Sequence, residues 1–178
     1  MDIGDWITLA AVVVALGIGV ASILHTQSLQ KQERKERLLN EIIEWATETI
    51  EWDIEKDYFT EKRLREADKP LLVILMQLIR LSEGFRSFKR KGQLILRPLA
   101  LVFKHQPLTD FMDELIYNLQ KHVELIGLQE MALMNDITAQ TLSNEFNSAV
   151  NEVTNHKKQL DQSATKVISE ATKLKSKL

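Results

Sequence analysis

The chain has 178 residues, a formal net charge of −2 and no cysteine. This length suffices for one soluble domain and a short additional segment. The lack of cysteine excludes a disulfide framework, a thiolate metal site and a cysteine nucleophile. Six glycines and three prolines are few, and they lie between long periodic runs, which predicts an all-α fold.

The first element is an apolar stretch from Trp6 to Leu24, nineteen residues without a charged side chain. As a helix it would reach roughly 28 Å, close to the thickness of a bilayer's hydrocarbon core. A buried core helix usually has a polar edge, and a signal peptide begins with basic residues, whereas this N-terminus has two acids and no base. We therefore expect residues 1–26 to form an uncleaved transmembrane anchor. The membrane-spanning candidates are Trp6, Val13, Gly19 and Leu24.

The charges that flank this stretch predict its orientation. No lysine or arginine precedes it, and four bases follow it within residues 31–37. Because short cytoplasmic flanks carry an excess of such bases, we expect the N-terminus outside and the rest of the chain in the cytoplasm.

A stripe of small residues, Ala11, Ala15 and Gly19, repeats at four-residue spacing within the predicted anchor. Such stripes let two membrane helices approach closely. The stripe is therefore a candidate for self-association, although small residues are common in membrane helices in any case.

Residues 27–135 are predicted to form a helical domain that continues from the anchor. No glycine or proline occurs from Gln27 to Lys56, and apolar residues recur there at helical spacing, so the helix should leave the membrane unbroken. Its glutamates form an acidic stripe, which reads either as a cation or basic-partner site or as a solvated, internally paired face. No Glu in the chain has a His three residues later, so we favour the second interpretation. Asp57 to Asp68 is expected to be a short helix or a connector.

The next run, Leu71 to Leu81, is apolar on almost all sides of a helix. We predict that it is the central core helix of the domain; the alternative is a segment that inserts into the membrane interface. The helix should continue through a basic cluster and end at Gly92. The cluster, our candidate for an anionic surface, consists of Arg86, Lys89, Arg90 and Lys91. It reads as a solvated helix end, as a contact with anionic lipids, or as a nucleic-acid contact. Nucleic acid is the least favoured partner, because no known binding motif accompanies the cluster.

Residues 93–104 read as a short apolar piece broken by Pro98, and Pro107 should open the next helix. From Leu108 to Ile126 the apolar residues share one face, which predicts an amphipathic helix.

Residues 136–178 are predicted to form a long amphipathic C-terminal helix. Apolar residues from Leu142 onward follow alternating steps of four and three, a spacing typical of a coiled coil. The same spacing would suit a helix packed on its own domain, and the sequence leaves both interpretations open. His156 lies in this seam and reads as a packing or register residue. The self-association candidates in the seam are Phe146, Val153, Leu160 and Val167.

No pattern of catalytic, phosphate-binding or metal-ligating residues occurs, so we expect no enzyme, no cofactor and no metal. The fold predicted is a single transmembrane helix followed by a cytoplasmic antiparallel helical bundle. The function predicted is a single-pass membrane-anchored interaction or scaffold module that self-associates. Its partners would be the lipid bilayer and a second copy or another helical protein. The alternatives are an effector that perturbs the bilayer through residues 71–91 and a nucleic-acid tether through residues 86–91.

Overall fold

The computed structural model describes the backbone of residues 3–54, 71–103, 105–139 and 143–178. It describes side chains for residue 16 and for residues 18–52, 71–103, 105–137 and 143–178. Within these ranges the chain forms four helices and no strand, which confirms the predicted all-α fold. The expected element between Asp57 and Asp68 lies outside the described residues.

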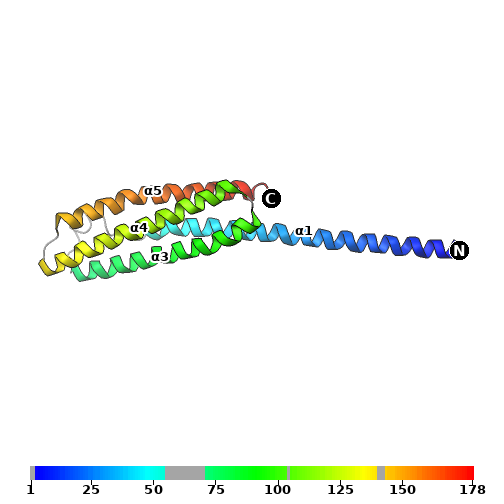
Figure 1. The fold of residues 1–178 in the computed structure, drawn as a ribbon, viewed down its shortest axis with the longest axis horizontal. Helices are drawn as coiled ribbons and strands as arrows, with labels where there is room; N and C mark the ends of the chain where they lie inside the picture. The colour runs from blue at the N-terminus through cyan, green and yellow to red at the C-terminus, as the bar shows by residue number, and fades with distance from the viewer. Residues whose placement is uncertain (1–2, 55–70, 104, 140–142) are drawn as a thin grey trace.

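The helices form an antiparallel bundle (Figure 1). Each runs opposite to the next along the chain, and α1 closes the bundle by packing against both α3 and α5. Their bounds are α1 Ile3–Ile54, α3 Leu71–Val102, α4 Gln106–Ala139 and α5 Asn144–Lys175.

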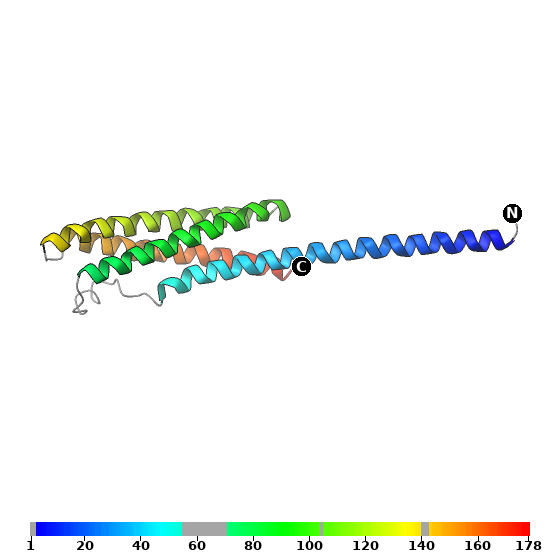
Figure 2. The same ribbon diagram turned by 90° about the horizontal axis from the view of Figure 1, so that it is seen from below.

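Helix α1 is the longest element, and only its C-terminal part belongs to the bundle. Its side chains become buried from Leu38 onward, with Leu39, Ile42 and Trp45 fully enclosed. The N-terminal part continues away from the bundle, and no other described helix lies beside it in Figure 1 or Figure 2. The predicted unbroken helix is therefore confirmed as far as Ile54.

The predicted membrane anchor lies in this projecting part of α1. In the part of the chain whose side chains are described, no helix is both long and apolar enough to cross a membrane. Most of Trp6–Leu24, including Trp6 and Val13, lies outside that part. The anchor therefore stays a prediction.

The core lies along the axis of the bundle, and all four helices contribute to it. Burial of one such aliphatic or aromatic side chain contributes about 1.5–3 kcal/mol to stability. The largest fully buried side chains include Trp45, Phe85, Phe146, Leu78, Met112, Leu115 and Leu119.

Helix α3 runs through Gly92 and Pro98 to Val102, so the predicted end at Gly92 is wrong. Gly92 has a packing role, because a Cβ placed there would lie 2.8 Å from Cε2 of Trp45, which crosses it from α1. The Trp45 indole Nε1 donates a hydrogen bond of 2.9 Å to the Phe88 carbonyl. Pro98 lacks the N–H that would reach the Leu94 carbonyl. Both residues are exposed, so water can replace that hydrogen bond.

Asp136 and Ser143 connect the end of α4 to the start of α5. The Ser143 hydroxyl accepts a hydrogen bond of 3.1 Å from the Phe146 N–H and so caps α5. Asp136, near the end of α4, accepts hydrogen bonds from the Ser143 N–H and hydroxyl at 2.9 and 3.1 Å. An N-cap of this kind contributes about 1 kcal/mol.

Helix α5 packs along α4 and α1 as a component of the bundle. Phe146, Val153, Leu160 and Val167 are all buried among the chain's own helices. Of the two interpretations that the sequence leaves open, a seam between two copies and packing on the chain's own domain, this burial supports the second, because the surface of these residues is already covered within one chain. Leu142, the first residue of the predicted seam, lies outside the described residues.

Candidate functional site

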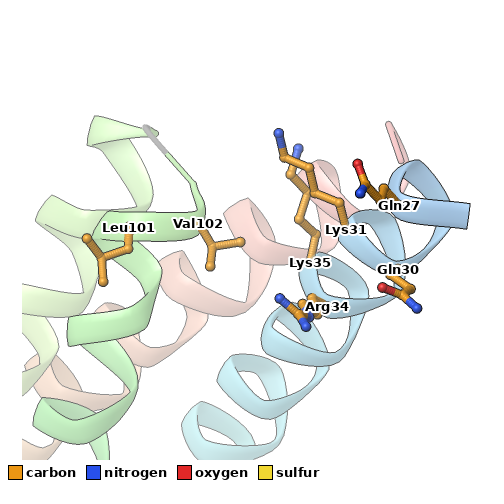
Figure 3. Close-up of a pocket in the computed structure, with 7 residues that line it drawn as sticks. All are labelled: Gln27, Gln30, Lys31, Arg34, Lys35, Leu101 and Val102. Atoms are coloured by element: carbon orange, nitrogen blue, oxygen red, sulfur yellow. The ribbon is translucent and has the colours of Figure 1, made fainter. Parts of the chain in front are cut away.

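A basic cleft opens where α1 leaves the bundle (Figure 3). It has a volume of about 690 Å³. Figure 3 shows Lys31 and Lys35 extending from α1 and Val102 directed towards α1 from the end of α3. The lining residues, which define the cleft, are Gln27, Gln30, Lys31, Arg34, Lys35, Leu101 and Val102.

The helical repeat explains why three bases reach this cleft together. Lys31, Arg34 and Lys35 are spaced by three and four residues, so they share one face of α1. That face lies one turn before the first buried turn, where Leu38 and Leu39 enter the core. The bases therefore stand at the point where α1 and α3 separate.

The electrostatics of the cleft favour an anion. No acid is among the described residues that line it, and Lys31, Arg34 and Lys35 make no described ion pair. The Lys35 ammonium lies 5.6 Å from the centroid of the Phe103 ring, a cation–π contact. Two acids neighbour these bases along α1, Glu33 before Arg34 and Glu36 after Lys35, but neither lines the cleft. Glu36 lies 3.9 Å from the Lys175 ammonium of α5. The cleft thus presents three basic side chains beside an apolar wall.

In the basic cluster predicted at residues 86–91, two of the four bases contact neighbouring helices. The Lys89 ammonium donates to the Gln120 side chain of α4 at 2.5 Å, and the Lys91 ammonium pairs with Glu48 of α1 at 2.8 Å. Arg86 and Arg90 are exposed. Two of the four bases are thus held by contacts between helices, and a lipid or nucleic-acid partner for the cluster stays a prediction.

Two histidines meet in the core, a pair that the sequence analysis did not find. His122 of α4 and His156 of α5 stack with ring centroids 5.5 Å apart, and their Nδ1 atoms are 3.3 Å apart. Phe85 packs edge-on against His122 at 4.7 Å. The sequence does contain a signal for the burial of His122, because this residue continues the spacing of four and three residues that begins with Leu115 and Leu119. It was missed because only apolar residues were counted along that face.

Burial lowers the pKa of both histidines of the pair. Desolvation, then the nearby His156 and Lys157 charges, lower the pKa of His122 to about 3. Burial and the Lys121 charge also lower the pKa of His156. His122, with a pKa of about 3, is therefore neutral at neutral pH, where its ring packs against His156 and Phe85.

Several further polar contacts join neighbouring helices. Glu114 of α4 pairs with Lys166 of α5 at 2.8 Å, and hydrogen bonding to Lys166 holds the pKa of Glu114 below its usual value. Ser163 donates to Glu114 at 3.2 Å, and His105 lies 2.8 Å from Glu170. These pairs fix the register of the helices and carry no catalytic geometry.

A group of exposed apolar residues, hereafter the distal face, lies towards the end of the bundle opposite the cleft. Residues from the start of α3 and the end of α4 form it, and these two helices are neighbours. Its members are Leu72, Met76, Ile79, Leu128, Met131 and Met134.

The described residues contain no group of three or more His, Asp or Glu side chains that could hold a metal ion. Gly19 and Leu24 of the predicted anchor are exposed, whereas the Ala11 and Ala15 side chains lie outside the described part. Comparison with family models, curated proteins and solved structures finds no match to this chain.

Proposed function

We propose that the chain is a single-pass membrane-anchored helical interaction module, with its N-terminus outside and its bundle in the cytoplasm. The observation that carries the proposal is the projection of α1 from the bundle as one unbroken helix (Figure 1). An apolar helix that projects from its domain is stable only if another apolar environment buries it. A bilayer provides that environment for a helix as long as Trp6–Leu24.

The described part of the projecting helix supports this proposal. Leu16, Ile18 and Leu24 are 60–67% exposed, although such side chains are usually buried in soluble proteins. The nearest basic residues, in the cleft, follow the apolar stretch directly. Their position favours a cytoplasmic bundle, because bases concentrate on the cytoplasmic side of single anchors.

The distal face supports the interaction role. Three of its six residues are methionines, whose flexible side chains adapt to varied partner surfaces. It lies at the end of the bundle away from the anchor, so the membrane would leave it accessible. A helical protein partner is the proposed occupant.

Self-association is proposed only through the anchor. The seam of α5 is covered within the chain, which leaves the stripe of Ala11, Ala15 and Gly19. A Cβ added at Gly19 would meet nothing within 4 Å, so its surface is open to a second helix.

Alkaline carbonate extraction of membranes tests the anchor. The full chain should stay in the pellet, and Val13→Lys with Leu16→Lys should release it, because each buried charge costs about 3 kcal/mol at the bilayer centre. The matched control, Leu128→Lys with Met131→Lys, puts the same charges on the distal face and should leave the chain in the pellet. Release of the unaltered chain would contradict the anchor.

A further inference from the structure

We propose that the basic cleft binds the headgroup of an anionic phospholipid. This inference rests on the proposed anchor, because the anchor sets the depth of the cleft relative to the bilayer. The cleft differs from the cluster at residues 86–91, since it joins α1 to the end of α3 and its bases remain unpaired within the described chain.

The charge of the cleft matches a phosphate group. Lys31, Arg34 and Lys35 place two ammonium groups and one guanidinium on one face of α1. Guanidinium groups bind phosphate oxygens through two parallel hydrogen bonds, and ammonium groups add point charge. Gln27 and Gln30 offer amide donors and acceptors to the hydroxyl or ester oxygens beside the phosphate.

The wall formed by α3 distinguishes a lipid from a free phosphate. Leu101 is 84% exposed at the end of α3, and Val102 points across the gap towards α1. A soluble phosphate ester would leave Leu101 in water, whereas the glycerol and upper acyl chain of a phospholipid would cover it. The volume of about 690 Å³ lies in the range of small-molecule sites.

The position of the cleft along α1 places it beside the headgroups. Gln27 lies three residues beyond Leu24, about 5 Å along a helix, and Lys31 lies seven residues beyond it, about 10 Å. Arg34 and Lys35 lie about 15–17 Å beyond Leu24. The interfacial layer on each side of a bilayer is about 5–8 Å thick. Side chains of a helix lean towards its N-terminus, here towards the membrane, so Lys31 can meet a phosphate in this layer. Arg34 and Lys35 would contact the part of a headgroup that extends beyond it.

Native mass spectrometry of the full chain tests the proposal. The chain would be released from micelles of neutral detergent that contain equal amounts of dioleoyl phosphatidylglycerol and dioleoyl phosphatidylcholine. We expect phosphatidylglycerol to be retained preferentially on the chain. Lys31→Gln, Arg34→Gln and Lys35→Gln together should lower that preference by about a hundredfold, since each of the three bases contributes about a fivefold factor.

A matched variant controls for the loss of three positive charges. Arg80→Gln, Arg90→Gln and Arg97→Gln remove three exposed bases from α3, and the preference should be unchanged. Leu101→Ser should weaken lipid retention with all three cleft bases still present, and excess glycerol phosphate should displace the lipid poorly. Both sets of variants should keep the circular dichroism spectrum of the unaltered chain.

Three results would overturn the proposal. The first is equal retention of the two lipids, and the second is an equal loss of preference in the α3 control. The third is displacement of the lipid by glycerol phosphate together with no effect of Leu101→Ser; that result would indicate a site for free phosphate. Carbonate extraction separates these failures from failure of the anchor. A chain that resists extraction but shows no lipid preference defeats only the cleft, whereas a chain that carbonate releases defeats the anchor.

Discussion

At the scale of single residues, α3 is shaped by contacts between glycine and tryptophan. Trp45 lies on Gly92, and Trp52 lies on Gly84, where an added Cβ would be 2.7 Å from the indole Nε1. Trp45 and Trp52 are two turns apart on α1, and the two glycines are two turns apart on the antiparallel α3. Each glycine thus leaves room for an indole between the two helices.

Gly92→Ala should therefore destabilise the protein, although alanine is the better helix former. Overpacking of a core position costs about 1–3 kcal/mol, which exceeds the gain in helix propensity of about 1 kcal/mol. The measurement is the urea midpoint of the full chain in neutral detergent. Gly127→Ala is the matched control, because a Cβ at that helical glycine meets nothing within 4 Å. It should be neutral or stabilising, and equal effects at the two sites would contradict the packing role.

The histidine pair predicts a loss of stability in acid. The unfolded chain takes up a proton at His122 near pH 6.5, whereas the folded chain, with a pKa of about 3, does not. Between these values the unfolded state binds more protons, so the free energy of unfolding falls as the pH falls, by up to about 1.4 kcal/mol per pH unit. This part of the stability is fully present above pH 6.5.

Urea unfolding of the full chain in neutral detergent at pH 7 and pH 5 measures this effect. His122→Leu should reduce the difference in stability between the two pH values, because the titrating imidazole is gone. His25→Gln, at an exposed position on α1, should leave the difference unchanged. An identical pH dependence in all three proteins would show that the buried pair does not contribute.

At the scale of helices, α5 is held in the bundle by both apolar and polar contacts. Its buried face includes Phe146, Leu160 and Val167, and Lys166 pairs with Glu114 beside it. The steps of four and three that indicated a coiled coil also suit a helix in an antiparallel bundle. The sequence could therefore predict which residues are buried, but not whether the covering helices come from the same chain.

Leu160→Asp distinguishes between two roles of α5, packing within its own chain and association with a second copy. Leu160 is fully buried, so an unpaired carboxylate there should lower the free energy of unfolding by about 3 kcal/mol or more. Helical content and cooperative thermal unfolding should both fall. Lys158→Asp, at an exposed position on the same helix, should change them little. If the variant kept its fold and lost only self-association, the buried face of α5 would instead be an interface between copies.

Sequence reasoning did better for the helices than for the site. Helical spacing predicted the unbroken α1 and the amphipathic α4, because one apolar face is a local signal. It wrongly ended α3 at Gly92, because Trp45, the residue that packs on this glycine, lies 47 positions earlier in the sequence. The cleft was missed for the same reason, since Lys31 and Leu101 are far apart along the chain. Only the packing of α1 beside α3 brings them together.

At the scale of the whole molecule, the alternating charge of the sequence is partly neutralised inside the bundle. Residues 38–68 carry a net charge of −6 and residues 69–104 a net charge of +7, and Glu48 pairs with Lys91 between these segments. Residues 105–156 carry −7 and residues 157–178 carry +4, and Glu114 pairs with Lys166 between them. The bases of the cleft remain outside these pairings, at the end of the bundle nearest the proposed membrane.

The architecture thus divides into two ends with different proposed roles. The end with the cleft would face lipid headgroups, and the distal face would meet a helical protein. The rigid antiparallel bundle holds these two surfaces apart by its own length (Figure 2). A protein recruited to the distal face would then be held at a set distance from the bilayer.

Single-cysteine labelling in intact cells tests the central claim most directly, and the lack of native cysteine removes any background. An impermeant maleimide should label Asp2→Cys in intact cells, and should label Ser176→Cys, on the exposed end of the chain beyond α5, only after the membrane is permeabilised. That result would place the two ends of the chain on opposite sides of one bilayer. Equal labelling of both cysteines before permeabilisation, or of neither, would contradict a single membrane-spanning helix.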